Sequence, residues 1–329
     1  MKFFDLHCDT IWQQYKSLTK NKKHIKLTNN NLMVDQNKLI KGNYYAQCFA
    51  IYVSDKDNAF SVCKDMIQLY YKEINQCKSL SPVLKYSDFK KNEESNKISA
   101  VLTVENGQVL QGDISHLNEL YKLGVKMICL THNQNNCIGY NNYGGFVDSK
   151  PDLLTPNTTK GLTEFGRQVV YEMNKLGIII DLSHISDKGF YDAISLSTKP
   201  VVCSHSNVRN LCPHVRNVTK EMLKKLASNG GLIGINTCKH FLETDNYCGE
   251  QTIDCMVEHV LYVRKLIGIE HLAIGTDFDG LDHEVEFSSC KDIPKLIPAL
   301  SRAGLSTTEI EKIAYKNALR VFKTNMVGN

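Results

Sequence analysis

Histidine and carboxylate side chains close several short, apolar, β-branched segments of this sequence. These segments are Phe3–His7, Val101–Glu105, Val125–His132, Ile178–His184, Val201–His205 and Leu272–Asp277. Imidazoles and carboxylates bind divalent metals and move protons, which are the two tasks of a metal-dependent hydrolase. Because the segments lie far apart in the chain, they can form one site only in a fold that gathers their ends.

A barrel of parallel strands is such a fold, because the C-terminal ends of all its strands meet at one mouth. The pattern predicts eight strands, at Lys2–His7, Tyr44–Val53, Ile98–Glu105, Val125–His132, Gly177–His184, Pro200–His205, Gly231–Thr237 and His271–Asp277. Helix-like segments alternate with them, at Leu162–Leu176, Glu221–Ala227, Gln251–Ile267 and from a Ser306/Glu309 capping box to Phe322. We therefore expect an α/β fold, a (β/α)8 TIM barrel of the amidohydrolase-like type, with residues 1–329 as a single catalytic domain.

Five residues at these strand ends are candidate metal ligands. His7 and Asp9 are two positions apart, so they share one face of a strand while Cys8 faces the other side. Glu105 ends an apolar segment, where a buried carboxylate is costly unless it is paired or binds a cation. His184 and His205 close consecutive strands and would lie side by side. The alternative is structural: a solvent-facing glutamate and histidines whose hydrogen bonds are satisfied within the fold.

Zinc suits this set of imidazoles and carboxylates, with manganese or cobalt as substitutes. Two ions that share Glu105 would hold a hydroxide between them, and this is a nucleophile at neutral pH. Asp277 follows the eighth apolar segment and is placed to carry the proton to a leaving amine. We expect Asp279 to stabilise the loop instead.

Composition argues against several other classes of protein. The chain is 42% hydrophobic and 22% charged, and no apolar run approaches the roughly 18 residues of a membrane span. A net charge of +4 is small, and the lysine-rich stretch Lys16–Lys26 lacks interleaved aromatics, so we expect no nucleic-acid binding. The first strand begins too early for a signal peptide, and the 12 cysteines include no CxxC pair. These features predict buried thiols in a cytoplasmic protein that does not bind membranes.

Two connections, 21–42 and 133–161, are too long and polar for simple turns. The second follows the fourth strand and therefore starts at the mouth of the barrel. We expect it to form a lid or a wall of the substrate pocket, with disorder as the alternative.

Several motifs, taken together, resemble the membrane (renal) dipeptidase family of zinc metallopeptidases over nearly the whole chain, in its soluble bacterial form. They are Asp5-Leu6-His7-Cys8-Asp9, Thr131-His132-Asn133, Gly161-Leu162-Thr163 with Gly166, Asp181-Leu182-Ser183-His184, Ser204-His205-Ser206-Asn207, His214-Val215-Arg216-Asn217-Val218 and Gly275 to Gly280. No single motif is as specific as this ordered set.

The resemblance implies a role for each candidate residue. His7 and Asp9 would bind one zinc ion, His184 and His205 the other, and Glu105 would bridge them. Asp277 would be the proton carrier. His132 would bind the substrate and stabilise the tetrahedral intermediate. Arg216 would bind the terminal carboxylate, and a guanidinium at a fixed distance from the scissile bond admits only short peptides.

The resemblance therefore implies a dipeptidase whose substrates include dipeptides with a C-terminal D-residue, and secondarily β-lactams. A homodimer is also implied. Two segments depart from the family's pattern: Asn136-Cys137-Ile138-Gly139 replaces a common Pro-Trp continuation, and Thr237-Cys238 stands where aromatic residues are common. Substrate preference is therefore expected to differ.

Two other functions fit part of the same sequence. One is a binuclear amidohydrolase that acts on a cyclic amide, lactone or phosphoester, where Arg216 would have no carboxylate to bind. The other is an inactive barrel that binds a peptide or carboxylate ligand. Retention of Asp277 with all five expected ligands argues against the inactive barrel.

Overall fold

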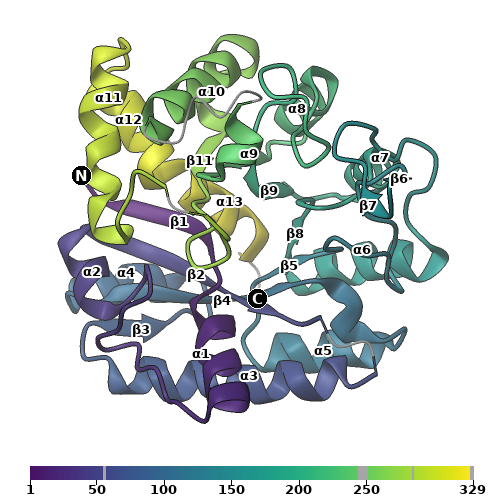
Figure 1. Cartoon of the computed structure of the whole chain (residues 1–329). Coiled ribbons are helices and arrows are strands. Elements are labelled where there is room, and N and C mark those ends of the chain that lie inside the picture. Colours follow the sequence, from purple (N-terminus) through teal and green to yellow (C-terminus); the bar gives the residue numbers. More distant parts are fainter. Residues whose placement is uncertain (55–56, 244–250, 284, 327–329) are drawn as a thin grey trace.

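Eight parallel strands form a closed barrel at the centre of the molecule, with helices around it (Figure 1). The computed structural model describes residues 1–54, 57–243, 251–283 and 285–326. The barrel strands are β1 (Phe3–Cys8), β2 (Tyr44–Tyr52), β4 (Ile98–Glu105), β5 (Met127–Cys129), β8 (Ile179–Asp181), β9 (Val202–Ser206), β10 (Leu232–Ile235) and β11 (Leu272–Ile274). Pairing of β2 with β4 closes the barrel, which confirms the predicted fold.

A ninth strand, which the sequence pattern did not predict, lies outside the barrel. β3 (Leu80–Pro82) pairs in parallel with the first half of β4, in the register Leu80↔Ile98. The second half of β4 pairs with β5, in the register Thr103↔Met127. The long strand β4 therefore pairs with both β3 and β5 along one of its edges.

The helix α6 (Glu164–Leu176) begins and ends where local sequence signals place it. Thr163 caps this helix by accepting a hydrogen bond from the Gly166 amide, and Gly177 ends it in the left-handed conformation. The other helices are α1 (Thr10–Asn21), α2 (Gln36–Lys41), α3 (Ala59–Gln76), α4 (Ser87–Glu94), α5 (Ile114–Lys122), α7 (Asp187–Leu196), α8 (Lys220–Ser228), α9 (Lys239–Leu242), α10 (Thr252–Ile267), α11 (Leu296–Arg302), α12 (Thr307–Glu311) and α13 (Asn317–Met326), with 3₁₀ turns η1 (Gly107–Leu110), η3 (Ile269–His271) and η4 (Cys290–Lys295).

The predicted last helix is interrupted. The Ser306/Glu309 capping box is present, but a π-helical turn, η5 (Lys312–Lys316), separates α12 from α13. α13 then packs Val321 and Phe322 against interior side chains of the strands such as Phe4 and Leu6. These side chains close the barrel at the end opposite its mouth.

Three site residues that the sequence pattern places at the ends of strands lie beyond those strands instead. His132, His184 and Asp277 each lie three positions after the last residue of β5, β8 and β11. His184 and Asp277 have φ of 67° and 65°, in the left-handed region that non-glycine residues seldom adopt. The predicted strands were thus too long at these ends, because the apolar pattern continues into the turns that carry the side chains.

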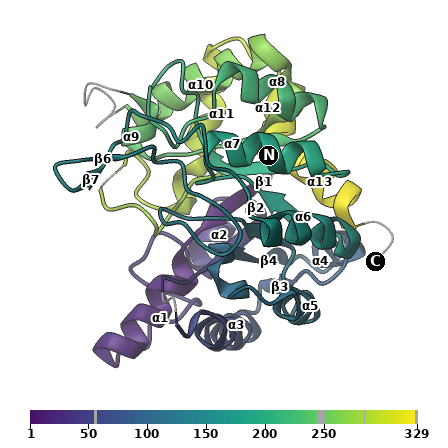
Figure 2. The same cartoon turned by 90° about the vertical axis from the view of Figure 1, so that its right-hand side faces the viewer.

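The segment 133–161 is an ordered excursion from the barrel. It contains a small antiparallel hairpin of β6 (Phe146–Val147) and β7 (Lys150–Pro151), which projects away from the strands in Figure 2. The Val215 amide donates to the Leu153 carbonyl at 2.9 Å, which ties the hairpin segment to the loop after β9. The segment 21–42 contains α2 and leads back to β2.

Cysteine pairing corrects one expectation. Ten cysteines of the described residues are free, and most of these are buried, as the sequence predicts. Cys255, however, is disulfide-bonded. The absence of a CxxC pair could not show this, because pairing depends on proximity in the fold. Cysteine usage alone therefore no longer supports a reducing compartment.

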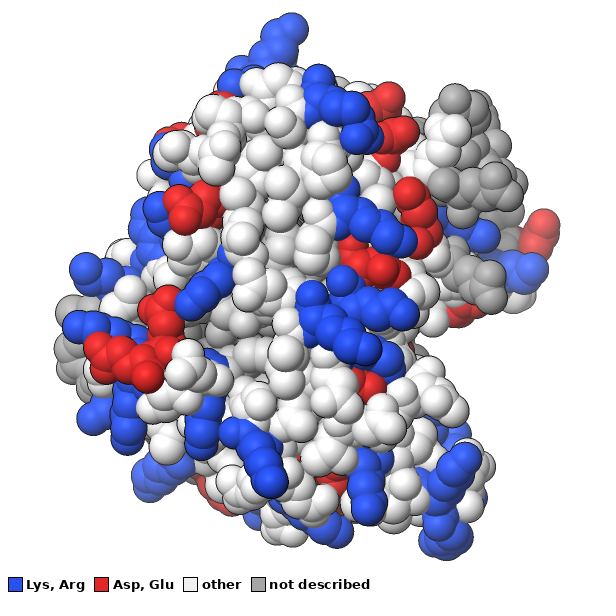
Figure 3. All heavy atoms as spheres, turned by 90° about the vertical axis from the view of Figure 1, so that its left-hand side faces the viewer, with Lys and Arg blue, Asp and Glu red and all other residues white. Residues whose placement is uncertain are grey.

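Two observations describe the helices and one face of the surface. Across the described part of the chain, no helix has both the length and the apolar character needed to cross a bilayer. On the face shown in Figure 3, acidic and uncharged side chains interrupt the basic ones, so this face carries no continuous basic patch among the residues described.

Candidate metal centre and active site

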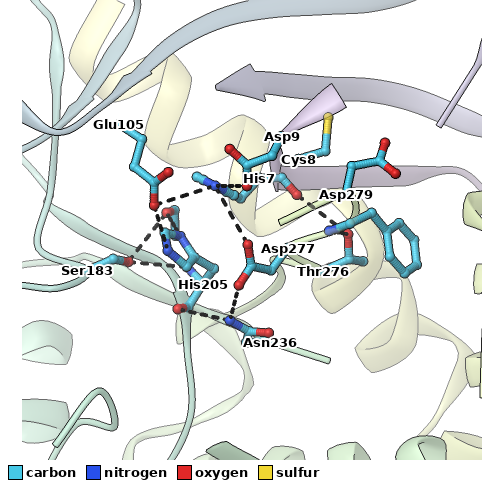
Figure 4. A network of polar contacts seen from close by, with 12 residues as sticks. His7, Cys8, Asp9, Glu105, Ser183, His205, Asn236, Thr276, Asp277 and Asp279 are labelled. Atoms are coloured by element: carbon cyan, nitrogen blue, oxygen red, sulfur yellow. Dashed lines mark hydrogen bonds and ion pairs between the residues drawn. The ribbon is translucent and has the colours of Figure 1, made fainter. Parts of the chain in front are cut away.

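The five expected ligands meet at the mouth of the barrel. His7 Nε2 lies 3.3 Å from Asp9 Oδ2 and 3.8 Å from Glu105 Oε1. The same glutamate oxygen lies 3.1 Å from His184 Nε2 and 3.4 Å from His205 Nε2. Figure 4 shows His7, Asp9, Glu105 and His205 directed at one centre, while Cys8 points away from it.

The two histidines His184 and His205 present lone pairs to each other. His184 Nδ1 lies 2.8 Å from the Asn133 amide oxygen, an acceptor, so Nδ1 carries the proton. Ser204 donates its hydroxyl to Asp181 and therefore accepts from His205 Nδ1 at 2.7 Å. Both Nε2 atoms are then unprotonated, and they lie 2.9 Å apart. Such an arrangement is repulsive unless a cation is bound beside them.

Burial makes the uncompensated charges of this cluster costly. Burial raises the pKa of Glu105 well above its usual value, and the nearby Asp9 raises it further. The pKa values of His184 and His205 lie well below their usual range because of burial and the charge of Arg216. Neutral imidazoles beside crowded carboxylates are the form in which these groups bind a divalent cation.

Two further observations fit a bound metal. The buried Asp9 Oδ1 has no hydrogen-bond partner among the described residues. A Cβ at Gly280 would lie 2.3 Å from Asp9 Oδ2 and 2.6 Å from Asp277 Oδ1, so a glycine there leaves room around both carboxylates. His7, Asp9 and Glu105 could hold one ion. Glu105, His184 and His205, whose nearest oxygen and Nε2 atoms lie 2.9–3.4 Å apart, could hold a second.

Asp277 lies at the edge of this cluster. Its Oδ1 is 3.9 Å from His7 Nε2, and its Oδ2 accepts a hydrogen bond from Asn236 Nδ2 at 3.0 Å. Burial and the charge of Asp9 raise the pKa of Asp277 to about 6, although His7 and Asn236 oppose this rise. Asp279 points elsewhere: it accepts from the Thr10 hydroxyl at 2.6 Å and the Met33 amide at 2.7 Å, which confirms its structural role.

His132 and Arg216 face the same space from two sides. His132 Nε2 lies 3.8 Å from Glu105 Oε1, and its ring packs 4.5 Å from that of Tyr52. Arg216 is 4% exposed and donates to the His205 carbonyl at 3.1 Å, with its guanidinium 5.3 Å from the Phe241 ring. Within the described part of the chain these contacts include no carboxylate, so its charge is available to a ligand.

A cavity of ≈ 540 Å³ joins these groups. Its walls include Asp9, Glu105, His132, His184, Arg216 and Asp277, with Asn133, Tyr143 and Leu153 from the segment 133–161. That segment is therefore a wall of the pocket, one of the two roles that we expect for it. The volume is adequate for a small molecule of the size of a dipeptide.

A third histidine and carboxylate group, His240, Asp282 and His283, lies at the rim. His283 Nε2 accepts the Lys239 amide at 3.2 Å, so its proton is on Nδ1 and is donated to Asp282 at 2.8 Å. Both ring nitrogens are thus in use. This group is better explained as a hydrogen-bonded corner of the rim than as a metal site.

The sequence model of the membrane dipeptidase family, peptidase family M19, matches residues 1–328. The chain belongs to this family. It is 29% identical to a dipeptidase of Claviceps purpurea over 334 residues, which cover 98% of this chain and 73% of the relative. It is 34% identical to an uncharacterised dipeptidase of Schizosaccharomyces pombe over 231 residues, or 70% of this chain and 54% of that one. The protein is therefore a dipeptidase of family M19, a metallopeptidase that hydrolyses peptide bonds.

Solved structures agree with the barrel. A metallopeptidase of Rhodobacter sphaeroides, crystallised with a phosphinate mimic of the dipeptide L-Ala-D-Ala, superposes with a TM-score of 0.90 at 21% identity, over 99% of both chains. At this level of identity the likeness shows the fold.

The structure of this M19 dipeptidase gathers all eight candidate residues at one cavity or at its floor. The sequence analysis did not identify the residues that orient these side chains. Asn133, Asp181, Ser204 and Asn236 fix ring tautomers or hold Asp277. The available signal was their position within one to three residues of a candidate ligand, or, for Asn236, at the end of the seventh strand.

Proposed function

We propose that this protein is a binuclear zinc dipeptidase that hydrolyses the single peptide bond of free-acid dipeptides, including those with a C-terminal D-residue. The observation that carries the proposal is the pairing, in one cavity, of a five-residue metal cluster with a buried Arg216 whose contacts include no carboxylate. A dipeptide carries a peptide carbonyl, which suits the metal cluster, and close to it a carboxylate, which suits Arg216. The mimic bound in the Rhodobacter neighbour is chemically of this class.

His7, Asp9 and Glu105 would hold one ion, and Glu105, His184 and His205 the other. Ions at this place would polarise the scissile carbonyl and lower the pKa of a water molecule between them. Nitrogen and oxygen ligands of this kind favour zinc, with manganese or cobalt as substitutes.

The protein's own groups then complete the reaction. Arg216 binds the terminal carboxylate and fixes the position of the peptide carbonyl. Burial and the charges of Arg216 and His7 lower the pKa of His132 to about 3, so this imidazole stays neutral and can donate an N–H to the carbonyl oxygen as negative charge develops there. Asp277, held by Asn236, takes the proton of the attacking water and gives it to the nitrogen as the C–N bond breaks.

A panel of L,L and L,D dipeptides, each beside its C-terminally amidated twin, tests the proposal with zinc-loaded protein. We expect release of both amino acids from the free acids and a large loss of kcat/KM on amidation. No cleavage of any member by protein shown to hold two zinc ions would refute the proposal and direct attention to cyclic amides and lactones. Equal cleavage of acid and amide would refute the role of Arg216 alone.

A further inference from the structure

A second hollow opens beside the catalytic cavity. It has a volume of ≈ 630 Å³ and shares Leu153, His214 and His240 with the cavity. Its apolar walls come from the hairpin segment and the loop after β9: Val147, Pro151, Leu153, Leu154, Cys212 and Pro213. Val147 and Leu154 are 58% and 68% exposed, so this segment offers apolar surface that a ligand could cover.

The entrance to this hollow lies beside the carboxylate-binding end of the cavity. His214, which both spaces share, accepts the Arg216 amide through its Nδ1 at 3.1 Å. Leu153, also shared, accepts the Val215 amide through its carbonyl at 2.9 Å. The side chain of a C-terminal residue is attached to the carbon next to its carboxylate. A dipeptide held at Arg216 therefore places that side chain close to His214 and Leu153.

We propose that this hollow is the subsite for the C-terminal side chain and that the enzyme prefers dipeptides whose C-terminal residue is large and apolar. The inference rests on the proposed function, because it uses Arg216 as the carboxylate site. Charged residues of both signs at the rim, among them Lys150 and Asp152, favour neither acidic nor basic side chains.

The test compares Ala-Gly, Ala-Ala, Ala-Leu and Ala-Phe with the reversed series Leu-Ala and Phe-Ala. We expect kcat/KM to rise about tenfold or more from Ala-Ala to Ala-Leu, the effect of burying an aliphatic side chain, with a smaller rise in the reversed series. If Ala-Gly is cleaved but Ala-Leu is no better than Ala-Ala, the subsite is refuted while the proposed function stands. Failure to cleave any dipeptide refutes the proposed function itself.

Two exposed residues of the same hairpin segment supply a matched pair of variants. Leu154 lines the hollow, whereas Phe146, which is 72% exposed, does not. Leu154→Asp should remove most of the preference for Ala-Leu over Ala-Ala, and Phe146→Asp should leave that preference unchanged. Equal effects of the two substitutions would overturn the assignment, because they would show a general property of the surface.

A different observation concerns the floor below Arg216. The buried Arg216 Nε and both polar side-chain atoms of Asn142, which is 1% exposed, lack hydrogen-bond partners among the described residues. Both residues line one enclosed cavity of ≈ 10 Å³, together with Ser206 and Asp187. This is about the room that one water molecule needs, and the walls offer the two to four polar groups that hold such a water.

We also infer that Asn142 positions Arg216 through one buried water molecule, which accepts the Nε–H and donates to the amide oxygen. The backbone of Asn142 is fixed independently, because its amide donates to the His184 carbonyl at 3.1 Å and its carbonyl accepts the Asn157 amide at 3.0 Å. A neutral amide orients the guanidinium and leaves its positive charge for the substrate. Asn142 is thus a positioning residue, and the inference rests on the proposed role of Arg216.

Asn142→Leu, which is nearly isosteric, and Asn142→Asp, which keeps an acceptor but adds charge, test this inference. Both should raise KM for a free-acid dipeptide about tenfold and change kcat less than threefold, with unchanged KM for the amidated twin and unchanged metal content. A purely structural role would instead reduce stability without selectivity for the carboxylate. Asn174→Leu, at a buried asparagine bonded to Thr198 on the far side of the barrel wall, should show that pattern.

Unchanged KM for the free acid in both folded Asn142 variants would overturn the inference. If Asn142→Leu does not fold, the Asp variant decides alone, because a carboxylate that shares the water with Arg216 would neutralise part of the charge that binds the free acid. A wild-type enzyme that treats acid and amide alike would instead refute the role of Arg216, on which this inference depends.

Discussion

Asn236 donates a hydrogen bond from Nδ2 to Oδ2 of Asp277 at 3.0 Å, which leaves Oδ1 of Asp277 facing His7 at 3.9 Å. One oxygen of the carboxylate is thus fixed by an amide, and the other is directed at the candidate metal ligands. The left-handed backbone of Asp277 aims the side chain into the cavity, and strained conformations of this kind concentrate at functional sites.

Replacement of Asp277 by Asn should remove the proton carrier while preserving shape. We expect kcat for a dipeptide to fall by about 10²–10⁴, the usual contribution of a general acid and base, with two metal ions retained. Kinetics together with metal analysis of the purified variant checks this. Asp279→Asn, at the neighbouring structural carboxylate, should reduce stability more than kcat. Near-normal kcat in metal-loaded Asp277→Asn would exclude the proposed role.

Removal of the hydroxyl that orients His205 should weaken metal binding. In Ser204→Ala, His205 Nδ1 loses its acceptor, so the ring is no longer held with Nε2 unprotonated toward Glu105. Loss of such an orienting partner lowers metal affinity by about 10- to 100-fold. Competition with a chelator measures the change. Ser195→Ala, which removes a helix-surface hydroxyl bonded to Asp192, should have no effect. Equal affinities in the two variants would contradict the orientation of His205 proposed here.

Chelation of the metals should destabilise the fold as well as abolish activity. Without cations, the unprotonated Nε2 atoms of His184 and His205 face each other and Glu105 in a buried space. Thermal unfolding should therefore show a lower Tm after dialysis against chelator, and Tm should recover with two equivalents of zinc per chain. Recovery with one equivalent, or an unchanged Tm, would contradict the binuclear site.

His259 should make stability sensitive to acid. Burial lowers the pKa of His259 to about 4, and the ring accepts the Val208 amide and lies 3.0 Å from the Leu242 carbonyl. The unfolded chain binds a proton near pH 6.5, but the native state does not until about pH 4, so stability is lost as pH falls through this interval. The loss is about 3 kcal/mol. Other buried histidines lose stability over the same interval, so urea unfolding should show a steeper pH dependence in the wild type than in His259→Gln, by about one proton. Parallel curves would contradict the assignment.

Close approach of two strand ends should make Gly275 intolerant of a side chain. A Cβ at this position would lie 1.8 Å from the Ser204 carbonyl oxygen, so one backbone must move. We expect Gly275→Ala to lower the free energy of unfolding by about 3 kcal/mol, toward the upper end of overpacking effects. Gly145→Ala, where the Cβ would meet nothing within 4 Å, is the matched control and should be nearly neutral. Similar unfolding curves for both would show that the barrel accommodates the added methyl group.

The sequence predicted the barrel well because each strand carries its own apolar, β-branched signal and parallel strands are buried on both faces. It predicted the strand ends poorly. The apolar residues Leu130 and Leu182 continue the pattern past β5 and β8, although the backbone has already left the sheet there. Periodicity cannot distinguish a buried strand from the buried turn that follows it.

Candidate ligands that come together in the fold could be chosen from the sequence because metal chemistry restricts the residue types at a site. Their orienting partners were not, because Asn133, Ser204 and Asn236 act through single hydrogen bonds that any loop residue could make. Nor could the sequence show that Asn142 and Arg216, 74 positions apart, line one small cavity. The hairpin within 133–161 was hidden because its two strands have two residues each, too few for an alternation pattern.

The packing of Val321 and Phe322 from α13 against the interior of the strands has a consequence for turnover. Because that end is filled, substrate enters and products leave through the mouth of the barrel. Both amino acids must therefore leave before the next dipeptide can bind. If Arg216 binds the terminal carboxylate as proposed, the departing C-terminal amino acid still carries that group and competes with incoming substrate. The enzyme would then be inhibited by its own product.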